Sequence, residues 1–565
     1  MMNRIWRTTT LVSMLVFVAA TAQSIPPPPE VVDRWRSEGR LDELAGIEKA
    51  ARAKGVNNLA IRSGLKGAAD VVGERRAIVI LVDFADNEAN LVDYPVSHFE
   101  EMLFSLGTYP TGSMRDYYAE NSHGQLDLTG TVVGWYRMPE DYAYYTDGEY
   151  GFGSYPQNAQ NLAEDAVSAA NGDVDFSQFD NDGPDGIPDS GDDDGYVDAL
   201  FVVHAGPEGA GGDGWGIWSH AWVTRTPKSV DGVLVYSYSM EPETGTIGVY
   251  CHELGHVFGL PDLYDYDYDS AGAGDWSVMA SGVHAAGGTT PVHFDAWSKV
   301  QLGWVEPVVP ASNQTGVEIP PAEEYPVAYK LWTDGSPGNE YFLIEFRKRQ
   351  LFDEFIPWKG LLVYHVDDSR SNNNYQNCGS GSPHYLVAVE QADGDCDLEY
   401  NLNSGDACDP FPGLSGVCSQ NFTFDGNTVP SSRAYDDSET DVALRNISVG
   451  GGVVSVDIEV TAVVTAVEAG GIDAYAGPLL DLCNPFEPGA FISYAVKSAS
   501  PVRLGIYDVR GRHVRTLADG VRPEGRAEVV WDGRDANRRP VASGVYFVTL
   551  ESEDARVVRK LLLAR

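Results

Sequence analysis

The stretch HELGHVFGLPDLYD, residues 252–265, contains the residue types that bind a metal ion and move protons. His252 and His256 are four positions apart, so on a helix both side chains lie on one face and can bind one cation. Glu253 follows the first histidine, where its carboxylate can take a proton from a metal-bound water. This spacing predicts a zinc site with a general base on the same helix.

A third zinc ligand is expected beyond that helix. Gly259 can adopt the left-handed conformation that ends a helix, so the chain can turn back there. Asp262 is the first carboxylate after the turn, and Asp265 is the alternative if the turn is longer. The apolar flanks TIGVYC and VFGL predict a buried helix. The competing interpretation, in which these groups sit on a solvated helix face, is disfavoured because uncompensated buried polar groups are costly.

A second group of candidate ligands lies in residues 179–201, FDNDGPDGIPDSGDDDGYVDALF, where aspartates are crowded between glycines. Carboxylates this close repel one another unless a cation neutralises them, and hard oxygen ligands at alternate positions suit Ca²⁺. The run leads into an apolar segment but lacks the glutamate that closes an EF-hand loop. A solvated acidic loop is the alternative. The predicted calcium ligands are Asp180, Asp182, Asp192, Asp194 and Asp198.

The first residues predict export. Arg4 and Arg7 precede a short apolar run, and ATA at residues 20–22 matches a cleavage site, so residues 1–22 are expected to be a signal peptide. The run is too short to span a bilayer, and no transmembrane helix is expected elsewhere. The formal net charge of −44 disfavours nucleic acid or an anionic membrane as a partner. We therefore expect a secreted or cell-surface, extracellular protein.

Four of the six cysteines are close together in the sequence. In an exported chain such a group predicts two disulfides. The sequence does not determine their pairing, and nearest-neighbour pairing is favoured. A second zinc site is the weaker alternative because no CxxC spacing occurs. The favoured pairs are Cys378 with Cys396, and Cys408 with Cys418.

Periodicity divides the chain into segments of different character. EVVDRWRSEGRLDELAGIEKAARAKG predicts one or two amphipathic helices before the first core strand, RAIVILVDF. Such a leader suits a pro-segment, and an ordinary helical extension is the alternative. Strands and helices then alternate until short alternating strands take over. The predicted domains are a helical pro-segment at 23–74, an α/β (α+β) catalytic domain at 75–304, a β-rich domain at 305–460, a linker at 461–478 and a β-sandwich at 479–565.

Beyond the zinc motif, the chain resembles the M6 family of secreted metallopeptidases, the immune-inhibitor-A-like proteases. Blocks that carry the likeness include VILVDFAD, DGYVDALFVVHAG, GDWSVMASG, DAWSKVQLGW and, further on, GLLVYHVDD and GDACDPFPG. They extend over roughly residues 75–460 in the order found in the family. The resemblance implies a metzincin-like zinc protease domain that hydrolyses protein or peptide substrates.

The metal segment is also similar to that of the snapalysins, whose HExxHxxGxxDxY motif binds zinc through His, His and Asp. Carried over, the ligands are His252, His256 and Asp262. Tyr264 matches the tyrosine of that motif and would stabilise the oxyanion, although a packing role is equally expected. Met279 in SVMASG matches the Met-turn that lies beneath the metal in such proteases.

The last segment resembles the FlgD-like immunoglobulin fold and the related type IX secretion sorting domains. VRLGIYDVRGRHVRTL, VVWDGRDANRRPVASGVYFVTL and RKLLLAR carry this likeness. It implies a bacterial export machine or cell-surface machinery as a partner. LCNPFEP departs from the usual Pro-Asn-Pro-Phe opening, which leaves open whether this copy is an export signal or a retained module.

The combined hypothesis is a secreted zinc endopeptidase made as a zymogen, with Glu253 as general base, zinc as the catalytic ion and calcium as a structural ion. The alternative of another class is a catalytically inactive surface-binding or adhesion protein on a protease fold. A degenerate copy would be expected to lose the glutamate or a ligand, and this chain has kept all of them. A zinc hydrolase of non-peptide bonds is a third, weaker alternative.

Overall fold

The computed structural model describes residues 25–56, 71–461 and 479–563, apart from 184, 189, 212–215, 375–377, 379–382, 483–489, 497–499, 509, 523–524, 532, 537 and 553–555. The chain falls into two compact units, residues 1–462 and 463–565, and each is described by itself. Among the described residues, no helix is long and apolar enough to cross a membrane. The predicted signal peptide at 1–22 lies outside the described residues.

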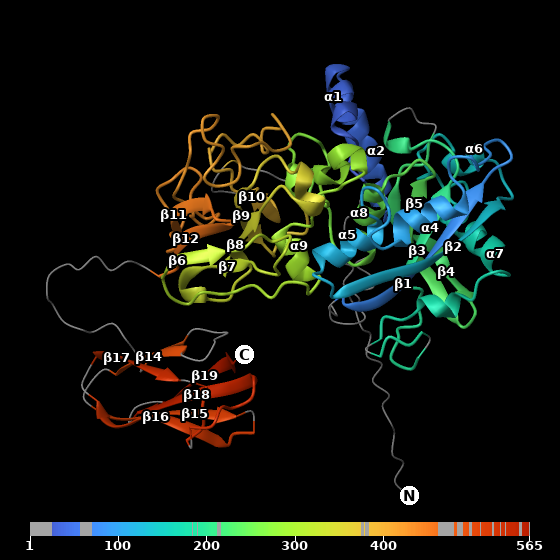
Figure 1. Cartoon of the computed structure of the whole chain (residues 1–565). Coiled ribbons are helices and arrows are strands. Elements are labelled where there is room, and N and C mark those ends of the chain that lie inside the picture. The colour runs from blue at the N-terminus through green and yellow to red at the C-terminus, as the bar shows by residue number, and fades with distance from the viewer. Residues whose placement is uncertain are drawn as a thin grey trace, which may run out of the picture. The chain divides into compact units, whose positions relative to one another are not determined.

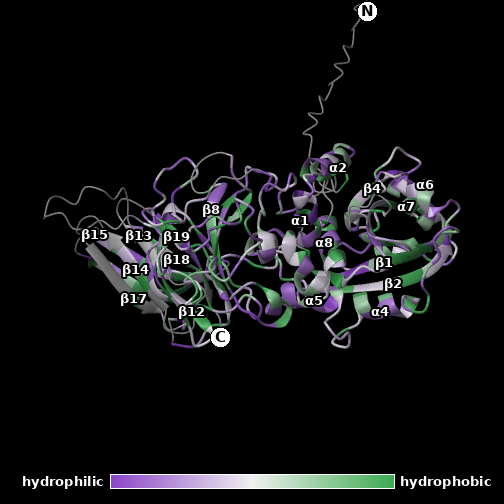
Figure 2. Ribbon diagram, turned by 90° about the horizontal axis from the view of Figure 1, so that it is seen from above, coloured by the Kyte–Doolittle hydropathy of each residue, from purple (hydrophilic) through white to green (hydrophobic). Residues whose placement is uncertain are grey.

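A five-stranded sheet forms the centre of the first unit, in the order β2-β1-β3-β5-β4 (Figure 1). Its strands are parallel except for β4, which pairs antiparallel with β5 and forms one edge. Residues 77–82 of β1, which lies between β2 and β3, are an unbroken buried apolar run, as expected for a strand covered on both faces (Figure 2). The strands are β1 (Gly73–Asp83), β2 (Leu126–Arg137), β3 (Ala199–His204), β4 (His220–Val230) and β5 (Val233–Pro242).

Helices pack on this sheet and on one another. Ser113 and Asp116 form a capping box that starts α5, and the Tyr118 hydroxyl of α5 donates to the Cys251 carbonyl of α8 at 2.7 Å. Helix α8 is thereby fixed between α5 and the sheet. The helices of this region are α4 (Val96–Phe104), α5 (Met114–Asn121), α6 (Tyr142–Thr146), α7 (Ala159–Ala170), α8 (Ile247–Val257) and α9 (Ala296–Gln301), with 3-10 turns at η1 (Phe176–Phe179), η2 (Gly209–Gly211), η3 (Gly274–Trp276) and η4 (Ser281–Gly288).

Two further helices precede the sheet: α1 (Pro29–Ser37) and α2 (Leu41–Ala53). Trp35 of α1 and Leu44 of α2 are fully buried and belong to the main hydrophobic core of the first unit. The N-terminal segment is therefore packed onto the domain that follows it.

The rest of the first unit is rich in β-strands, as expected. Its sheets have the orders β10-β9-β8-β7 and β11-β12-β6, and all their pairs are antiparallel. Both expected disulfides are present, Cys378–Cys396 and Cys408–Cys418, while Cys251 is free and buried. The elements are β6 (Gln314–Ile319), β7 (Tyr329–Leu331), η5 (Thr333–Gly335), β8 (Glu340–Arg347), η6 (Leu351–Phe355), β9 (Gly360–Asp367), β10 (Val387–Val389), β11 (Ala443–Gly450) and β12 (Val453–Glu459).

The second unit consists of two antiparallel sheets, β13-β14-β17 and β16-β15-β18-β19. Trp531 and Ile492 of the first sheet share one buried core with Leu504 and Val548 of the second, as in a β-sandwich. The strands are β13 (Leu479–Leu482), β14 (Ala490–Val496), β15 (Ser500–Asp508), β16 (His513–Arg522), β17 (Gly525–Trp531), β18 (Gly544–Ser552) and β19 (Arg556–Leu563).

Candidate metal centre

Helix α8 presents the histidines and the glutamate of the zinc motif. The helix ends at Val257, and Gly259 follows with φ +98°, a left-handed conformation that an L side chain rarely adopts. This turn reverses the chain and returns Asp262 to the helix. The local sequence alone therefore accounts for the approach of the third residue to the other two.

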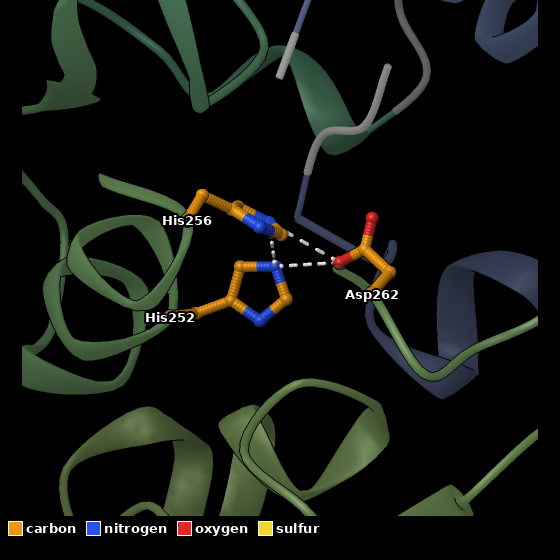
Figure 3. A group of neighbouring side chains, drawn as sticks. All are labelled: His252, His256 and Asp262. Carbon is orange, nitrogen blue, oxygen red and sulfur yellow. Dashed lines mark hydrogen bonds and ion pairs between the residues drawn. The ribbon is translucent and has the colours of Figure 1, made fainter. Parts of the chain in front are cut away.

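The side chains of His252, His256 and Asp262 point toward one another (Figure 3). The Nε2 atoms of the two histidines are 3.1 Å apart. Asp262 Oδ1 lies 3.0 Å from Nε2 of His252 and 3.3 Å from Nε2 of His256. All three side chains are buried. Ligand atoms about 2.0–2.2 Å from a tetrahedral zinc are roughly 3.3–3.6 Å apart, so these spacings are close to those of a zinc site.

The hydrogen bonds of the two histidine rings orient both toward one point. Nδ1 of His252 donates to the Val278 carbonyl and Nδ1 of His256 to the Leu260 carbonyl, both at 2.8 Å. Each neutral ring then has its Nε2 lone pair directed inward, toward the other lone pair and toward the Asp262 carboxylate. Three acceptors that converge on one buried point repel one another unless a cation lies between them, so the donor set fits zinc.

Glu253 is fully buried beside this cluster. Burial raises the pKa of its carboxyl well above the usual range, and the nearby carboxylates of Glu241, Asp262 and Glu208 raise it further. The Ile25 amide opposes this rise in the pKa of Glu253. The hydrogen bond that the amide donates goes to the Ser219 carbonyl at 3.3 Å. The buried carboxyl lies one residue after His252, where it is positioned to accept and return a proton.

Met279 packs against α8 where the helix carries Gly255. A Cβ atom at Gly255 would lie 2.8 Å from the Met279 sulfur, so only glycine lets the helix approach this closely. The hydroxyl of Ser277 accepts from the Met279 amide at 3.1 Å and holds the turn. Met279 is thus in contact with α8.

The two remaining candidates near the motif have other partners. Asp265 accepts from the amide and the hydroxyl of Ser270, at 3.0 and 2.6 Å. The Tyr264 hydroxyl donates to Oε1 of Glu48 at 3.3 Å. Because Glu48 belongs to α2, the N-terminal segment reaches the metal cluster.

This N-terminal contact was not foreseen from the sequence. Arg52 of α2 binds Glu48 at 2.6 Å, lies 3.8 Å from Asp262 Oδ2 and covers the Tyr266 ring. The side chains of Arg52 and Glu48 are 8% and 2% exposed, so α2 covers this side of the cluster. Their four-residue spacing on an amphipathic helix was visible in the sequence, but nothing there identified what the pair contacts.

The acidic loop brings together a set of aspartates that differs in part from the predicted set. One carboxylate oxygen of each of Asp180, Asp182 and Asp193 lies within 4.8 Å of the others. Asp193 was not among the predicted ligands. The other predicted ligands accept local hydrogen bonds, Asp192 from Ser190, Asp194 from the Tyr196 amide and Asp198 from the Asn181 amide.

Comparisons with known proteins find two family matches in this chain. Residues 70–305 match the catalytic domain of the immune inhibitor A peptidases, M6, and residues 486–556 match the FlgD Ig-like domain. Immune inhibitor A of Bacillus thuringiensis subsp. alesti is 34% identical over 273 residues, 40% of this chain and 39% of that protein. The pre-pro-metalloprotease PrtV of Vibrio cholerae serotype O1 is 32% identical over 274 residues, 40% of this chain and 30% of that protein.

The chain thus spans well under half the length of these relatives. Among solved structures, OgpA of Akkermansia muciniphila covers 88% of this chain and 94% of its own, at 10% identity and a TM-score of 0.19, which carries no argument about the fold. The matched segment 70–305 contains the whole metal cluster and Glu253. The chain therefore contains one segment similar to the catalytic domain of the M6, immune inhibitor A, peptidases, at residues 70–305, and one similar to the FlgD Ig-like domain, at residues 486–556.

Proposed function

We propose that this protein is a secreted zinc-dependent endopeptidase that hydrolyses peptide bonds of extracellular proteins. The observation that carries the proposal is the convergence of His252, His256 and Asp262 beside the buried carboxyl of Glu253. The resemblance of Met279 and its turn to the metzincin arrangement supports the assignment of this domain to that fold type. The similarity to immune inhibitor A and to PrtV, whose name describes a metalloprotease, supports peptide bonds as the substrate.

Zinc, held by His252, His256 and Asp262, would supply Lewis acidity and lower the pKa of a bound water. Glu253 accepts the proton of the attacking water and delivers it to the nitrogen of the leaving amine. The Tyr264 hydroxyl, once its contact with Glu48 is broken, donates a hydrogen bond to the developing oxyanion. The Nδ1 hydrogen bonds of the two histidines keep both rings oriented throughout.

The full chain is a zymogen in this proposal, with residues 23–74 as the pro-segment. The buried pair of Glu48 and Arg52 lies directly on Asp262 and Tyr264, so α2 obstructs the site that a substrate must reach. Removing the segment would expose the cluster and free the Tyr264 hydroxyl. Cleavage or displacement of α2 is therefore the activating step.

Calcium is proposed as a structural ion of the acidic loop. Asp180, Asp182 and Asp193 offer three oxygens close together, and oxygen ligands of this kind suit Ca²⁺. Asp192, Asp194 and Asp198 remain candidates through water or after a small loop adjustment. The ion would fix the loop that leads into β3 and so support the sheet on which α8 packs.

The C-terminal β-sandwich is proposed to connect the enzyme with bacterial secretion or cell-surface machinery. This follows from its match to the FlgD Ig-like domain and from the leader-like residues 1–22. Detection of the protein in the medium or on the cell surface, and its loss on deletion of residues 479–565, would support this role.

The peptidase proposal is tested by hydrolysis of casein and of a quenched fluorescent peptide by the purified full-length protein after removal of the N-terminal segment by limited proteolysis. We expect cleavage that a zinc chelator abolishes and that added zinc restores. Cleavage that persists unchanged after the chelator has removed all bound metal would refute a zinc mechanism, and absence of cleavage in the zinc-loaded, processed protein would refute peptidase activity.

A further inference from the structure

Leu263 directly follows Asp262, and its backbone is held by three other parts of the chain. The Leu263 amide donates to the Met279 carbonyl at 2.8 Å, and the Leu263 carbonyl accepts from the Ala273 amide at 2.7 Å. The same carbonyl accepts a second hydrogen bond, from Nδ2 of Asn373 at 2.9 Å. Leu263 is fully buried, so water does not compete for these bonds. The backbone position of Asp262 therefore depends on the partners of its neighbour.

Asn373 belongs to the β-rich region and connects that region to the turn. Its side chain is fully buried. Nδ2 also donates to the Val387 carbonyl at 2.7 Å, and Oδ1 accepts from the Val387 amide at 3.0 Å. Val387 is the first residue of β10, the edge strand of the sheet β10-β9-β8-β7. The side chain thus pairs with an edge strand as a neighbouring strand would, and its other N–H is directed to Leu263.

The chemistry of the Asn373 side chain matches the three backbone groups that it contacts. Two carbonyls require two N–H donors and one amide requires an acceptor, which is the set that an asparagine carries. Aspartate has no N–H donor. Leucine has the same branched skeleton but neither donates nor accepts. Replacing this side chain would therefore leave buried backbone groups without their partners, which is costly.

Two further hydrogen bonds join the β-rich region to the same segment. Oδ1 of Asn374 accepts from the Tyr266 amide at 3.0 Å, and Nδ2 of Asn401 donates to the Tyr268 carbonyl at 2.8 Å. These two contacts lie further along the segment. The contact of Asn373 is made at the residue next to Asp262, so it bears most directly on the position of that carboxylate.

We propose that Asn373 is a positioning residue of the zinc site: by holding the Leu263 carbonyl, it keeps the Asp262 carboxylate in place for the metal. The inference rests on the proposed zinc peptidase function and makes the β-rich region part of the metal centre. The two histidines are fixed by α8, whereas Asp262 follows the turn and depends on tertiary contacts. Asn373 lies outside residues 70–305, the segment similar to the peptidase catalytic domain.

The zinc affinity of Asn373→Leu protein tests this proposal. All variants are made in full-length Glu253→Gln protein to prevent self-cleavage, and affinity is measured by competition with a chromophoric chelator. We expect at least tenfold weaker zinc binding, because groups that orient metal ligands typically contribute about 10–100-fold to affinity. If Asn373→Leu does not fold, Asn373→Ser replaces it, since one hydroxyl cannot donate to both carbonyls.

Asn421→Leu is the matched control. Nδ2 of Asn421 also donates to a backbone carbonyl of the β-rich region, that of Ala392 at 3.0 Å, and its Oδ1 accepts from the Thr423 amide at 3.1 Å. We expect this variant to bind zinc as tightly as the parent protein. Equal zinc affinities of the Asn373 and Asn421 variants would overturn the proposal.

Activity separates positioning from a general loss of stability. In the processed protein with Glu253 intact, Asn373→Leu should lower kcat/KM at limiting free zinc at least tenfold, in proportion to the lost affinity. Excess zinc should restore hydrolysis to near the wild-type rate, with KM unchanged. A deficit that excess zinc leaves unchanged, together with wild-type zinc affinity, would assign Asn373 to the fold alone and contradict the proposal.

A third measurement needs neither metal nor activity. Hydrogen–deuterium exchange of the metal-free, full-length Glu253→Gln protein is followed by mass spectrometry in peptides that cover residues 262–276. Asn373→Leu should speed exchange in this segment, and Asn421→Leu should leave it unchanged, because only the first releases the turn. If the parent protein binds no zinc, the proposed zinc function fails. Equal exchange in the two variants would show that Asn373 does not hold the turn and would overturn the inference by itself.

Discussion

The guanidinium group of Arg52 lies 3.8 Å from Oδ2 of Asp262, although one residue belongs to an N-terminal helix and the other to the turn after the zinc motif. The same guanidinium binds Glu48 at 2.6 Å and covers the ring of Tyr266. A positive charge is thus buried against the carboxylate that we propose as a zinc ligand. The N-terminal segment and the metal cluster form one interface, and changes on either side should affect both.

Arg52→Ala should weaken latency. Removing one member of a buried ion pair typically costs about 3–5 kcal/mol, because the partner carboxylate is left uncompensated. We expect α2 to detach more readily and activity of the full-length protein to appear at least tenfold sooner, measured with a fluorescent peptide. Arg40→Ala is the control, since Arg40 makes only exposed pairs with Glu38 and Glu43. Equal activation times for the two variants would remove Arg52 from this role.

The third zinc ligand can be decided by metal content. Asp262 Oδ1 lies 3.0 Å from His252 Nε2, whereas Asp265 is bound to Ser270. Asp262→Ala should therefore lower zinc affinity at least a hundredfold, and Asp265→Ala should retain bound zinc at full stoichiometry, measured by competition with a chromophoric chelator. The opposite order would make Asp265 the ligand.

Calcium should stabilise the acidic loop. We expect millimolar Ca²⁺ to raise the melting temperature of the zinc-saturated protein by several degrees relative to excess EGTA, because it neutralises the cluster of Asp180, Asp182 and Asp193. Asp193→Asn should reduce this shift, and Asp185→Asn, on the exposed side of the loop, should preserve it. Identical melting curves with and without Ca²⁺ would exclude a structural calcium ion there.

We expect His365, in the β-rich region, to make a pH-dependent contribution to the stability of the fold. Burial lowers the pKa of its ring, but hydrogen bonds to Glu340 and Glu390, at 3.0 and 3.2 Å, outweigh burial and raise it. A histidine whose pKa is raised by folding contributes stability that is present below about pH 6.5 and is lost as pH rises through the folded pKa. His365→Gln should therefore lower the melting temperature more at pH 6 than at pH 9. His513→Gln, at an exposed position, is the control and should change the melting temperature equally at pH 6 and pH 9. A His365→Gln effect on the melting temperature that grows with pH would contradict this account.

The zinc motif could be predicted because its geometry is local. The four-residue spacing of the histidines and the left-handed turn at Gly259 require no distant part of the chain. The apolar run of β1 was predictable for the same reason. The sequence did not determine the disulfide pairing, and the favoured nearest-neighbour pairs are the ones present. The packing of the N-terminal segment against the site could not be predicted from the sequence. Glu48 and Tyr264 are 216 positions apart, and no local sequence pattern indicates that they are in contact. In the acidic loop, Asp193 accepts a hydrogen bond from the Gly183 amide, which directs its side chain into the loop. The alternate spacing of aspartates in the sequence does not determine this direction.

The central claim is that Glu253 acts as general base on water at a zinc site, and Glu253→Gln tests it most directly. The amide has nearly the same shape as the carboxyl and cannot accept the proton. We predict one bound zinc, an unchanged melting temperature within a few degrees and peptide hydrolysis lowered by at least a thousandfold in the processed enzyme. Zinc-saturated Glu253→Gln protein that retains activity within tenfold of the wild type would contradict the account.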